Sequence, residues 1–297
     1  MKRKTLFTYS LLGILLMIIG QLCFSINDTI VKFEVKKIEN IFLIFNIIFI
    51  RGIFATIIIF IYLYFFEKKN IFKIIWNKNY YFRGIYEVAT ALFFFTGLMF
   101  MPISQVYTLL MTNPFFVTIF AYFFLKERVG LRRWTAVIIG FVGVLIIIKP
   151  QNMSFNYLFL FPILAAIFLT IRDINTKNIV TKENSFEIIF ITSLLICIFS
   201  GLSSLYFGFE VKLNQIPNIF ISAIFLTIAY LFSVLTIFYA PLSLTASSRY
   251  SVIIFGIIFG YLILNEIPTF NMIVGAVIIT SSGIFVIKRQ KDLGKID

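Results

Sequence analysis

Apolar residues along this chain fall in long, nearly uninterrupted runs rather than in strict alternation or one-sided helical stripes. Each run has about 17 to 26 residues, enough for a helix rising about 1.5 Å per residue to cross roughly 30 Å of hydrocarbon. Strands of a membrane barrel would be about ten residues long and would alternate. The pattern predicts an all-α integral membrane protein. Its ten expected transmembrane helices cover residues 6–30, 41–66, 80–101, 103–125, 131–148, 155–174, 186–207, 217–239, 242–264 and 270–287.

Two distant stretches of the sequence resemble each other. Residues 101–127 read MPISQVYTLLMTNPFFVTIFAYFFLKE, and residues 240–266 read APLSLTASSRYSVIIFGIIFGYLILNE. A second echo joins INDTIVK, which contains Asp28, to IRDINTK, which contains Asp173. Chance similarity between apolar helices is one explanation, and a duplication into residues 1–150 and 151–297 is the one we favour. The most telling matches are Pro102 with Pro241, Ser104 with Ser243, Tyr122 with Tyr261 and Glu127 with Glu266.

The duplication has a consequence for topology. Five expected helices separate the two copies, and an odd number of crossings reverses the direction of the chain. The two five-helix repeats would therefore be inverted. Inverted repeats are a construction of secondary transporters, which expose one central site to each side of the membrane in turn. The repeat thus predicts transport by alternating access.

Composition and charge agree with a membrane location. Of 297 residues, 60% are hydrophobic and 13% are charged, whereas soluble domains average about 45–50% and 25%. The net charge of +13 would suit nucleic acid, but the basic residues follow the membrane segments, so no nucleic-acid partner is expected. With a cytosolic N-terminus most of them fall in cytosolic segments, which places both termini in the cytosol. They are Lys2, Arg3, Lys4, Lys68, Lys69, Lys73, Lys78, Arg83, Lys126, Arg128, Arg132, Arg133, Lys177, Lys182, Lys288, Arg289, Lys291 and Lys295.

Several other classes of protein are disfavoured. The basic start before an apolar run resembles a signal peptide, but no small-x-small cleavage site follows, so we expect a retained first span. The chain has no His and two cysteines, Cys23 and Cys197, which indicates neither a disulfide framework nor a metal site. Without a phosphate-binding loop, ATP-driven transport would need a separate subunit, and none is evident. An enzyme and a receptor-like protein are weaker alternatives, and no cofactor is expected.

Charged residues inside the predicted spans are candidates for binding cargo. Such residues cost about 2.5 to 3.5 kcal/mol to insert and usually face a cavity or a partner. Arg51, Glu87 and Arg249 lie at comparable depths. A guanidinium suits a carboxylate, and Glu87 suits an ammonium or sulfonium group, so the set suits a zwitterion. The alternatives are that Glu87 pairs with Arg249 or with Arg83, and that Arg51 packs between helices.

Two acidic residues end the corresponding helices of the two repeats. Asp28 and Asp173 each precede a lysine by four residues, Lys32 and Lys177. One interpretation is a local ion pair at a helix end. The other is a gating or proton-coupling role, which predicts that Asp28→Asn abolishes any pH dependence of transport.

A proline and several polar residues mark the expected helix 103–125 as part of the transport path. Pro114 lacks an amide donor and is expected to kink this helix. Asn113, Gln105 and Tyr107 share it, and Tyr250 lies at a similar level in the helix expected over 242–264. In that second helix Gly256 and Gly260 allow close packing against a neighbour. The packing is internal or forms a dimer interface, so a monomer and a homodimer both stay open.

The sequence resembles the drug/metabolite transporter superfamily, specifically its EamA family of ten-helix, five-plus-five proteins. The resembling features are Arg51 in FNIIFIRGIFA, the stretch YFFLKERVGLRRWTAVIIGFVGVLIIIKP after Pro114, and its counterpart GYLILNEIPTFNMIVGAVIITSSGI. One departure is Ile253, which stands where the first repeat has Pro114. The resemblance covers essentially the whole chain. It implies a transporter of amino acids, nucleosides, vitamins or other metabolites, in either direction.

A narrower resemblance concerns the cargo. SSRYSVIIFGIIFGYLILNE, INDTIVK and IRDINTKNIV are similar to the S-adenosylmethionine transporters of obligate intracellular bacteria, which belong to the same branch. This resemblance implies a bacterial cytoplasmic (inner) membrane protein that moves an amino-acid-like zwitterion or S-adenosylmethionine. A proton-coupled exporter of amino acids or other metabolites is the alternative within the family.

Overall fold

The computed structural model describes residues 2–37, 43–123, 131–148, 157–180, 183–239 and 248–292. These residues form helices joined by turns, with no strand among them, so the all-α prediction is confirmed. Six helical segments within these ranges are long and apolar enough to cross a membrane. They are Leu12–Val35, Ile44–Phe66, Ile103–Phe120, Tyr157–Lys177, Ser185–Phe207 and Leu213–Tyr239.

Three of the residues matched between the two similar stretches, Glu127, Pro241 and Ser243, lie outside the described residues.

The helices follow the apolar runs of the sequence. In chain order the main helices are α1 (Lys2–Val35), α2 (Ile44–Ile61), α3 (Ile71–Ile75), α4 (Asn79–Phe100), α5 (Ile103–Leu110), α6 (Asn113–Phe123), α7 (Leu131–Ile148), α8 (Leu160–Ile179), α9 (Ser185–Phe207), α10 (Ile216–Tyr239), α12 (Ser251–Leu264) and α13 (Phe270–Asp292). A π-helical turn, η2 (Tyr62–Phe66), extends α2, and the short 3₁₀ turns η4 (Tyr157–Phe159) and η5 (Leu213–Gln215) precede α8 and α10.

Polar residues define helix ends where the chain leaves the apolar runs. The Asn184 side chain accepts a hydrogen bond from the amide of Phe186 at 2.8 Å and so caps the start of α9. Asn70 does the same for α3 by accepting from the amide of Lys73. Asn265 ends α12 in the left-handed conformation, with φ of 55°, which Asn adopts more readily than most residues. Local side chains therefore explain where these three helices begin or end.

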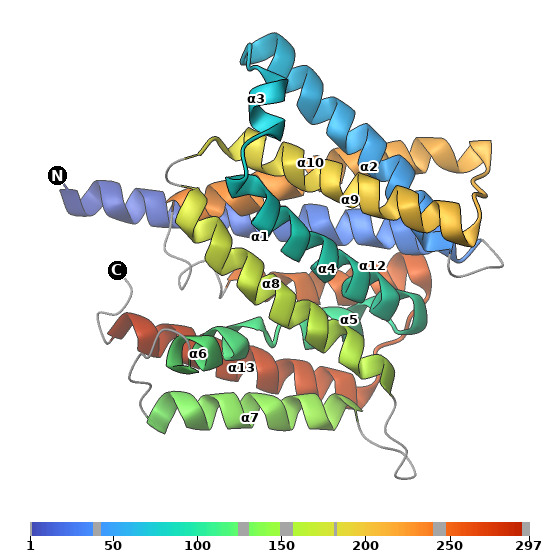
Figure 1. Ribbon diagram of the computed structural model, residues 1–297. Coiled ribbons are helices and arrows are strands. Elements are labelled where there is room, and N and C mark those ends of the chain that lie inside the picture. The colour runs from blue at the N-terminus through green and yellow to red at the C-terminus, as the bar shows by residue number, and fades with distance from the viewer. Residues whose placement is uncertain are drawn as a thin grey trace.

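Helices from the two halves of the sequence pack against one another. Within the described ranges the broadest helix pairings are α1 with α10, α7 with α13, α4 with α8 and α2 with α9. Figure 1 shows α7 and α13 lying side by side along one edge of the molecule. α5 packs on α12 as well. The hydrophobic core is consequently built between residues 1–150 and 151–297 more than within either segment.

The contact between α5 and α12 depends on two glycines. A Cβ at Gly256 would lie 2.4 Å from Cδ2 of Tyr107, and one at Gly260 would lie 3.1 Å from Cγ2 of Ile103. Both distances are shorter than ordinary carbon contacts, so only hydrogen fits at Gly256. Gly256 and Gly260 of α12 therefore face α5, and the close packing that they allow is internal.

The helix expected over residues 103–125 is divided into two. α5 ends at Leu110, and α6 begins at Asn113. Pro114 then occupies the first turn of α6, where a missing amide donor costs little. The expected kink at Pro114 is instead a break just before it. The amide and hydroxyl of Thr112 donate to the Leu109 carbonyl at 3.1 Å and 2.8 Å, which satisfies one of the acceptors that the break leaves.

Candidate functional site

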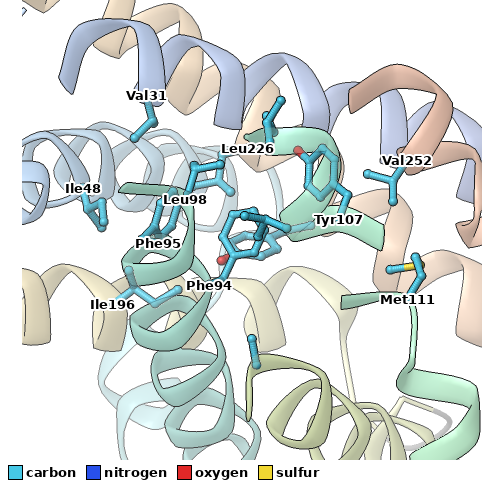
Figure 2. Close-up of a cluster of buried hydrophobic side chains, with 14 of the residues drawn as sticks. Val31, Ile48, Phe94, Phe95, Leu98, Tyr107, Met111, Ile196, Leu226 and Val252 are labelled. Atoms are coloured by element: carbon cyan, nitrogen blue, oxygen red, sulfur yellow. The ribbon is translucent and has the colours of Figure 1, made fainter. Parts of the chain in front are cut away.

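A cavity with about 680 Å³ of space free of protein atoms, part of it open to solvent, lies among helices from both halves. One part of its wall is apolar and aromatic. Figure 2 shows Phe94 of α4 near Tyr107 of α5, and these two rings stack with centroids 5.8 Å apart. The ring of the adjacent Phe95 packs edge-on against Phe94 with centroids 5.2 Å apart. The break between α5 and α6 contributes Leu110 and Met111 to the same wall. Irregular backbone at membrane depth is tolerated where it lines a cavity, which explains why the break occurs here.

Five charged side chains complete the wall. Three are guanidinium groups and two are carboxylates, and all are at least nine-tenths buried. Burying so many charges is unfavourable unless they have partners or a ligand. They are Asp28, Arg51, Glu87, Arg172 and Arg249.

Asp28 and Arg51 are linked indirectly on one flank of the cavity. Arg51 Nη1 donates to Asn27 Oδ1 at 3.0 Å, and its guanidinium lies 4.9 Å from the centre of the Phe95 ring. Asp28 accepts from Asn27 Nδ2 and from the Tyr107 hydroxyl, both at 2.7 Å. Arg51 Nε is buried and has no hydrogen-bond partner among the described residues.

A chain of alternating charges lies at another part of the wall. Arg172 Nη1 donates to Glu87 at 2.7 Å, and its Nε and Nη2 donate to Asp173 Oδ1 at 3.1 Å and 2.6 Å. Arg249 Nη1 donates to the second oxygen of Asp173. Glu87 therefore pairs with Arg172, because α4 packs against α8, and the alternative pairs of Glu87 with Arg249 or with Arg83 are wrong. Arg83 donates to the hydroxyls of Thr176 and Thr192 instead.

The lysines that follow the two aspartates bind elsewhere. Lys32 Nζ lies 2.7 Å from a carboxylate oxygen of Glu266 and also donates to the carbonyl of Met101. Lys177 is exposed. The interpretation of Asp28 and Asp173 as local pairs with Lys32 and Lys177 is therefore wrong. A helical i,i+4 spacing permits such pairs, but the tertiary neighbours of each side chain decide between partners.

Glu266 joins the end of α1 to the start of α5. Besides Lys32, it lies 3.3 Å from Lys36 Nζ, and its Oε2 accepts from the amide of Ile103 at 2.8 Å. The last contact caps the start of α5 from the segment that follows α12. The cluster ties α1 to α5 and to the end of α12.

Four of the candidate binding and gating residues lie off the cavity wall. Asn113 donates to Thr170 on α8 at 3.0 Å and so fixes the start of α6. Tyr250 packs against Gly283, where a Cβ would lie 1.5 Å from the tyrosine oxygen. Gln105 is partly exposed on α5, away from the wall. Asp173 is also off the wall, although both arginines that it binds lie on it.

Arg172 is the functional candidate that sequence reasoning missed. Its signal was present in IRDINTK, where it occupies the position that Asn27 holds in INDTIVK. Both side chains donate to the aspartate that follows them, and each also contacts a charged residue on another helix. The echo between the two segments therefore extends to their side-chain bonding.

A second polar network lies between the end of α2 and the turn joining α8 to α9. The Tyr80 hydroxyl lies 2.6 Å from Glu183 and 2.7 Å from Glu187, and Lys69 pairs with Glu187 at 3.0 Å. Hydrogen bonds from Tyr80 and then from Asn79 and Asn77 lower the pKa of Glu183 below its ordinary value. The hydrogen bond and charge of Glu187 raise the pKa of Lys69.

Comparison with known proteins places the chain in a family. The sequence model described as the EamA-like transporter family matches residues 11–149 and again residues 156–288. The chain belongs to the EamA-like transporter family. This EamA-like protein is accordingly a multi-pass membrane transporter rather than an enzyme.

Several curated proteins are similar to this EamA-like transporter. An S-adenosylmethionine uptake transporter of Rickettsia bellii is 28% identical over 289 residues, which cover 96% of each chain. A riboflavin transporter of Rhizobium johnstonii is 30% identical over 197 residues, 65% of each chain. A pseudopaline exporter of Pseudomonas aeruginosa is 20% identical over 286 residues, 94% of this chain and 97% of the relative. The family thus includes relatives with different cargoes and directions.

A solved crystal structure of a protein is similar to this EamA-like transporter in fold. The TM-score is 0.61 at 13% sequence identity, and the match covers 94% of this chain and 98% of the other. At this identity the similarity concerns the fold alone.

Proposed function

We propose that this EamA-like protein is a secondary transporter of a small zwitterionic metabolite, either amino-acid-like or S-adenosylmethionine itself. It works by alternating access in a bacterial cytoplasmic membrane. In this proposal ten transmembrane helices form two inverted repeats, residues 1–150 and 151–297, with both termini in the cytosol. The double family match and the pairing of helices between the two segments support this arrangement.

One observation carries the functional proposal. A single cavity between the two segments combines guanidinium and carboxylate groups with aromatic rings. A zwitterion needs both signs of charge at one site, and the rings offer stacking surface to the rest of the molecule. The Rickettsia relatives named as S-adenosylmethionine uptake transporters favour that cargo over free amino acids.

Each candidate residue has a role in this proposal. Arg249 receives the cargo carboxylate, Glu87 receives its cationic group, and Arg51 and Tyr107 contact it from the other flank. Tyr250, Asn113 and Gln105 support the helix ends around the cavity without touching cargo. Asp28 and Asp173 are gating residues, because each carboxylate joins two helices that must separate when the site opens.

A proton-coupled exporter of amino acids is the second candidate. Asp28 favours it, because this buried carboxylate accepts from two neutral side chains and has no ion-pair partner among the described residues. Such a carboxylate can bind a proton without breaking an ion pair. The energy source is then the proton gradient rather than the gradient of the cargo.

Uptake by reconstituted liposomes tests both candidates. We expect saturable uptake of labelled S-adenosylmethionine, competed by few ordinary amino acids and independent of an imposed pH gradient. Arg249→Ala should abolish this uptake in protein that still folds. Uptake of amino acids alone, and only with a pH gradient, would instead favour the exporter and make Asp28→Asn the next variant. Conversion of the cargo inside the liposomes would contradict both.

A further inference from the structure

Asp173 is shared between two cavity arginines. Each of its oxygens accepts from a different guanidinium, Oδ1 from Arg172 and Oδ2 from Arg249. Asp173 is 1% exposed and lies behind the wall that both arginines line. The guanidinium groups of Arg172 and Arg249 bind the same carboxylate and carry like charges that repel each other in a buried site. The carboxylate between them offsets that repulsion. Asp173 therefore holds both guanidinium groups at the cavity.

The two arginines are committed to protein partners to different degrees. Arg172 uses Nε, Nη1 and Nη2 in bonds to two carboxylates. Arg249 makes one bond to Asp173, and its Nε is buried with no partner among the described residues. Buried donors are ordinarily satisfied, so an unpaired one beside a cavity indicates an acceptor that arrives with the ligand. Of the two arginines that share Asp173, Arg249 is thus the one with free bonding capacity.

The start of α12 adds to this capacity. Arg249 lies in a helical turn two residues before α12, and Ser251 at the first position of α12 has a buried hydroxyl without a partner among the described residues. The first amides of a helix carry partial positive charge and favour an anion. Val252 of the same turn lines the cavity. The guanidinium of Arg249 and the start of α12 therefore favour one acidic group at this place.

We infer that the carboxylate of Asp173 occupies Arg249 in the empty transporter and that the cargo carboxylate displaces it. The inference rests on the proposed function and adds a positioning residue to it. Asp173 keeps its bond to Arg172 when Arg249 turns to the cargo, so no carboxylate is left unpaired. The displacement breaks the link between α8 and the start of α12, which couples cargo binding to the separation of these two elements. After the cargo leaves, Asp173 binds Arg249 again.

The equivalent position of the other repeat lacks this exchange. Asp28 accepts hydrogen bonds from the side-chain amide of Asn27 and the hydroxyl of Tyr107. Neither group is a cation for which the cargo carboxylate would compete. The two aspartates therefore respond differently to an acidic group. One carboxylate competes with the cargo, and the other does not.

Asp173→Asn separates the affinity for cargo from the rate of transport. With the competing carboxylate gone, the half-saturating concentration of labelled S-adenosylmethionine in liposomes should fall about tenfold, a change of about 1.4 kcal/mol. The maximal rate should fall as well, because Arg249 no longer has a partner that displaces the cargo. A purely structural role would lower the rate without tightening binding. An unchanged or raised half-saturating concentration would therefore overturn the inference.

Glu34→Gln is the matched control. Glu34 is a fully buried carboxylate on α1 that contacts Lys37, Gln215 and Asn218 outside the cavity. This variant loses a buried carboxylate too, and its half-saturating concentration should equal that of the wild type. Tightening in both variants would show that the effect is unspecific and would overturn the inference.

A second measurement covers the case in which Asp173→Asn does not fold, and it does not depend on transport. Methionine should raise the unfolding temperature of the purified wild-type protein more than methioninamide, which lacks the carboxylate. The double variant Asp173→Asn/Arg249→Gln removes both charges and should lose this preference. Equal effects in the wild type, or a preference kept by the double variant, would overturn the inference. If liposomes take up no S-adenosylmethionine while methionine still stabilises the protein more than methioninamide, only the proposed cargo is refuted.

Discussion

Removing the carboxylate of Glu266 should strongly destabilise the transporter, although Glu266 lies outside the cavity wall. Its side chain binds Lys32 at 2.7 Å and Lys36 at 3.3 Å and caps α5 through the amide of Ile103 at 2.8 Å. The side chains of Lys32 and Glu266 are 8% and 12% exposed, so their pairing is poorly screened by solvent. The variant Glu266→Ala removes all three contacts at once.

The magnitude follows from that geometry. Two unit charges 2.7 Å apart attract by about 6 kcal/mol at an effective dielectric constant of about 20, and desolvation offsets part of this gain. Removing one partner of a buried pair costs about 3 to 5 kcal/mol. The Ile103 amide left without an acceptor costs about 1 to 3 kcal/mol more. Lys32 keeps its bond to the Met101 carbonyl, so we expect a total near the lower end of the summed ranges, about 4 kcal/mol.

A double-mutant cycle isolates the ion pair from the other contacts. The variants are Glu266→Gln, Lys32→Met and both together, with the free energy of unfolding measured by denaturant titration in mixed micelles. Glu266→Gln retains an oxygen that can cap α5, so the cycle reports the charge interaction. We expect a coupling energy of about 1 to 3 kcal/mol. Additive effects of the two single changes would refute the structural argument for this pair.

Three further predictions concern packing, the helix break and pH. Gly256→Ala places a methyl group 2.4 Å from Cδ2 of Tyr107, so it should lower the unfolding temperature and reduce uptake. Gly260→Ala places a methyl group 3.1 Å from Cγ2 of Ile103 and should have a smaller effect on both. Pro114→Ala should change the free energy of unfolding by less than about 1 kcal/mol, because Pro114 stands in the first turn of α6 and supports no kink; a loss of more than that would contradict the break. Hydrogen bonds lower the pKa of Glu183, so they stabilise the folded protein above the ordinary glutamate pKa, and this contribution is lost as the pH falls through the lowered value. The unfolding temperature should therefore fall less steeply in Glu183→Gln than in the wild type as the pH is lowered from above the ordinary glutamate pKa, about 4.3, to below the lowered value, and identical pH profiles would show that this network contributes nothing.

Residue spacing predicts the helices of this protein but not the partners of its buried charges. Long apolar runs required helices in a membrane, because backbone amides inside hydrocarbon must be bonded within their own helix. The scarcity of charge in those runs also made each interior charge conspicuous. Of the charges chosen in this way, Asp28, Arg51, Glu87 and Arg249 lie on one cavity wall.

The partners of those charges followed from the packing of helices. Glu87 pairs with Arg172 because α4 lies against α8, and Lys32 pairs with Glu266 because α1 lies against the end of α12. These helices are apolar around most of their circumference, so the sequence does not mark which face meets which neighbour. The break before Pro114 was equally hidden, since a proline is compatible with a kink inside a helix and with the start of a new one.

The sequence by itself determined the helical membrane fold and the small set of side chains that carry charge into it. Hydrophobicity and backbone bonding act locally along the chain, and a linear pattern is sufficient to specify them. Only the tertiary structure decided that Arg172 joins Glu87 to Asp173 and that Asp173 is shared with Arg249. Ion pairs form between the charges that helix packing brings within a few ångströms, and that distance is a property of the folded arrangement rather than of residue spacing.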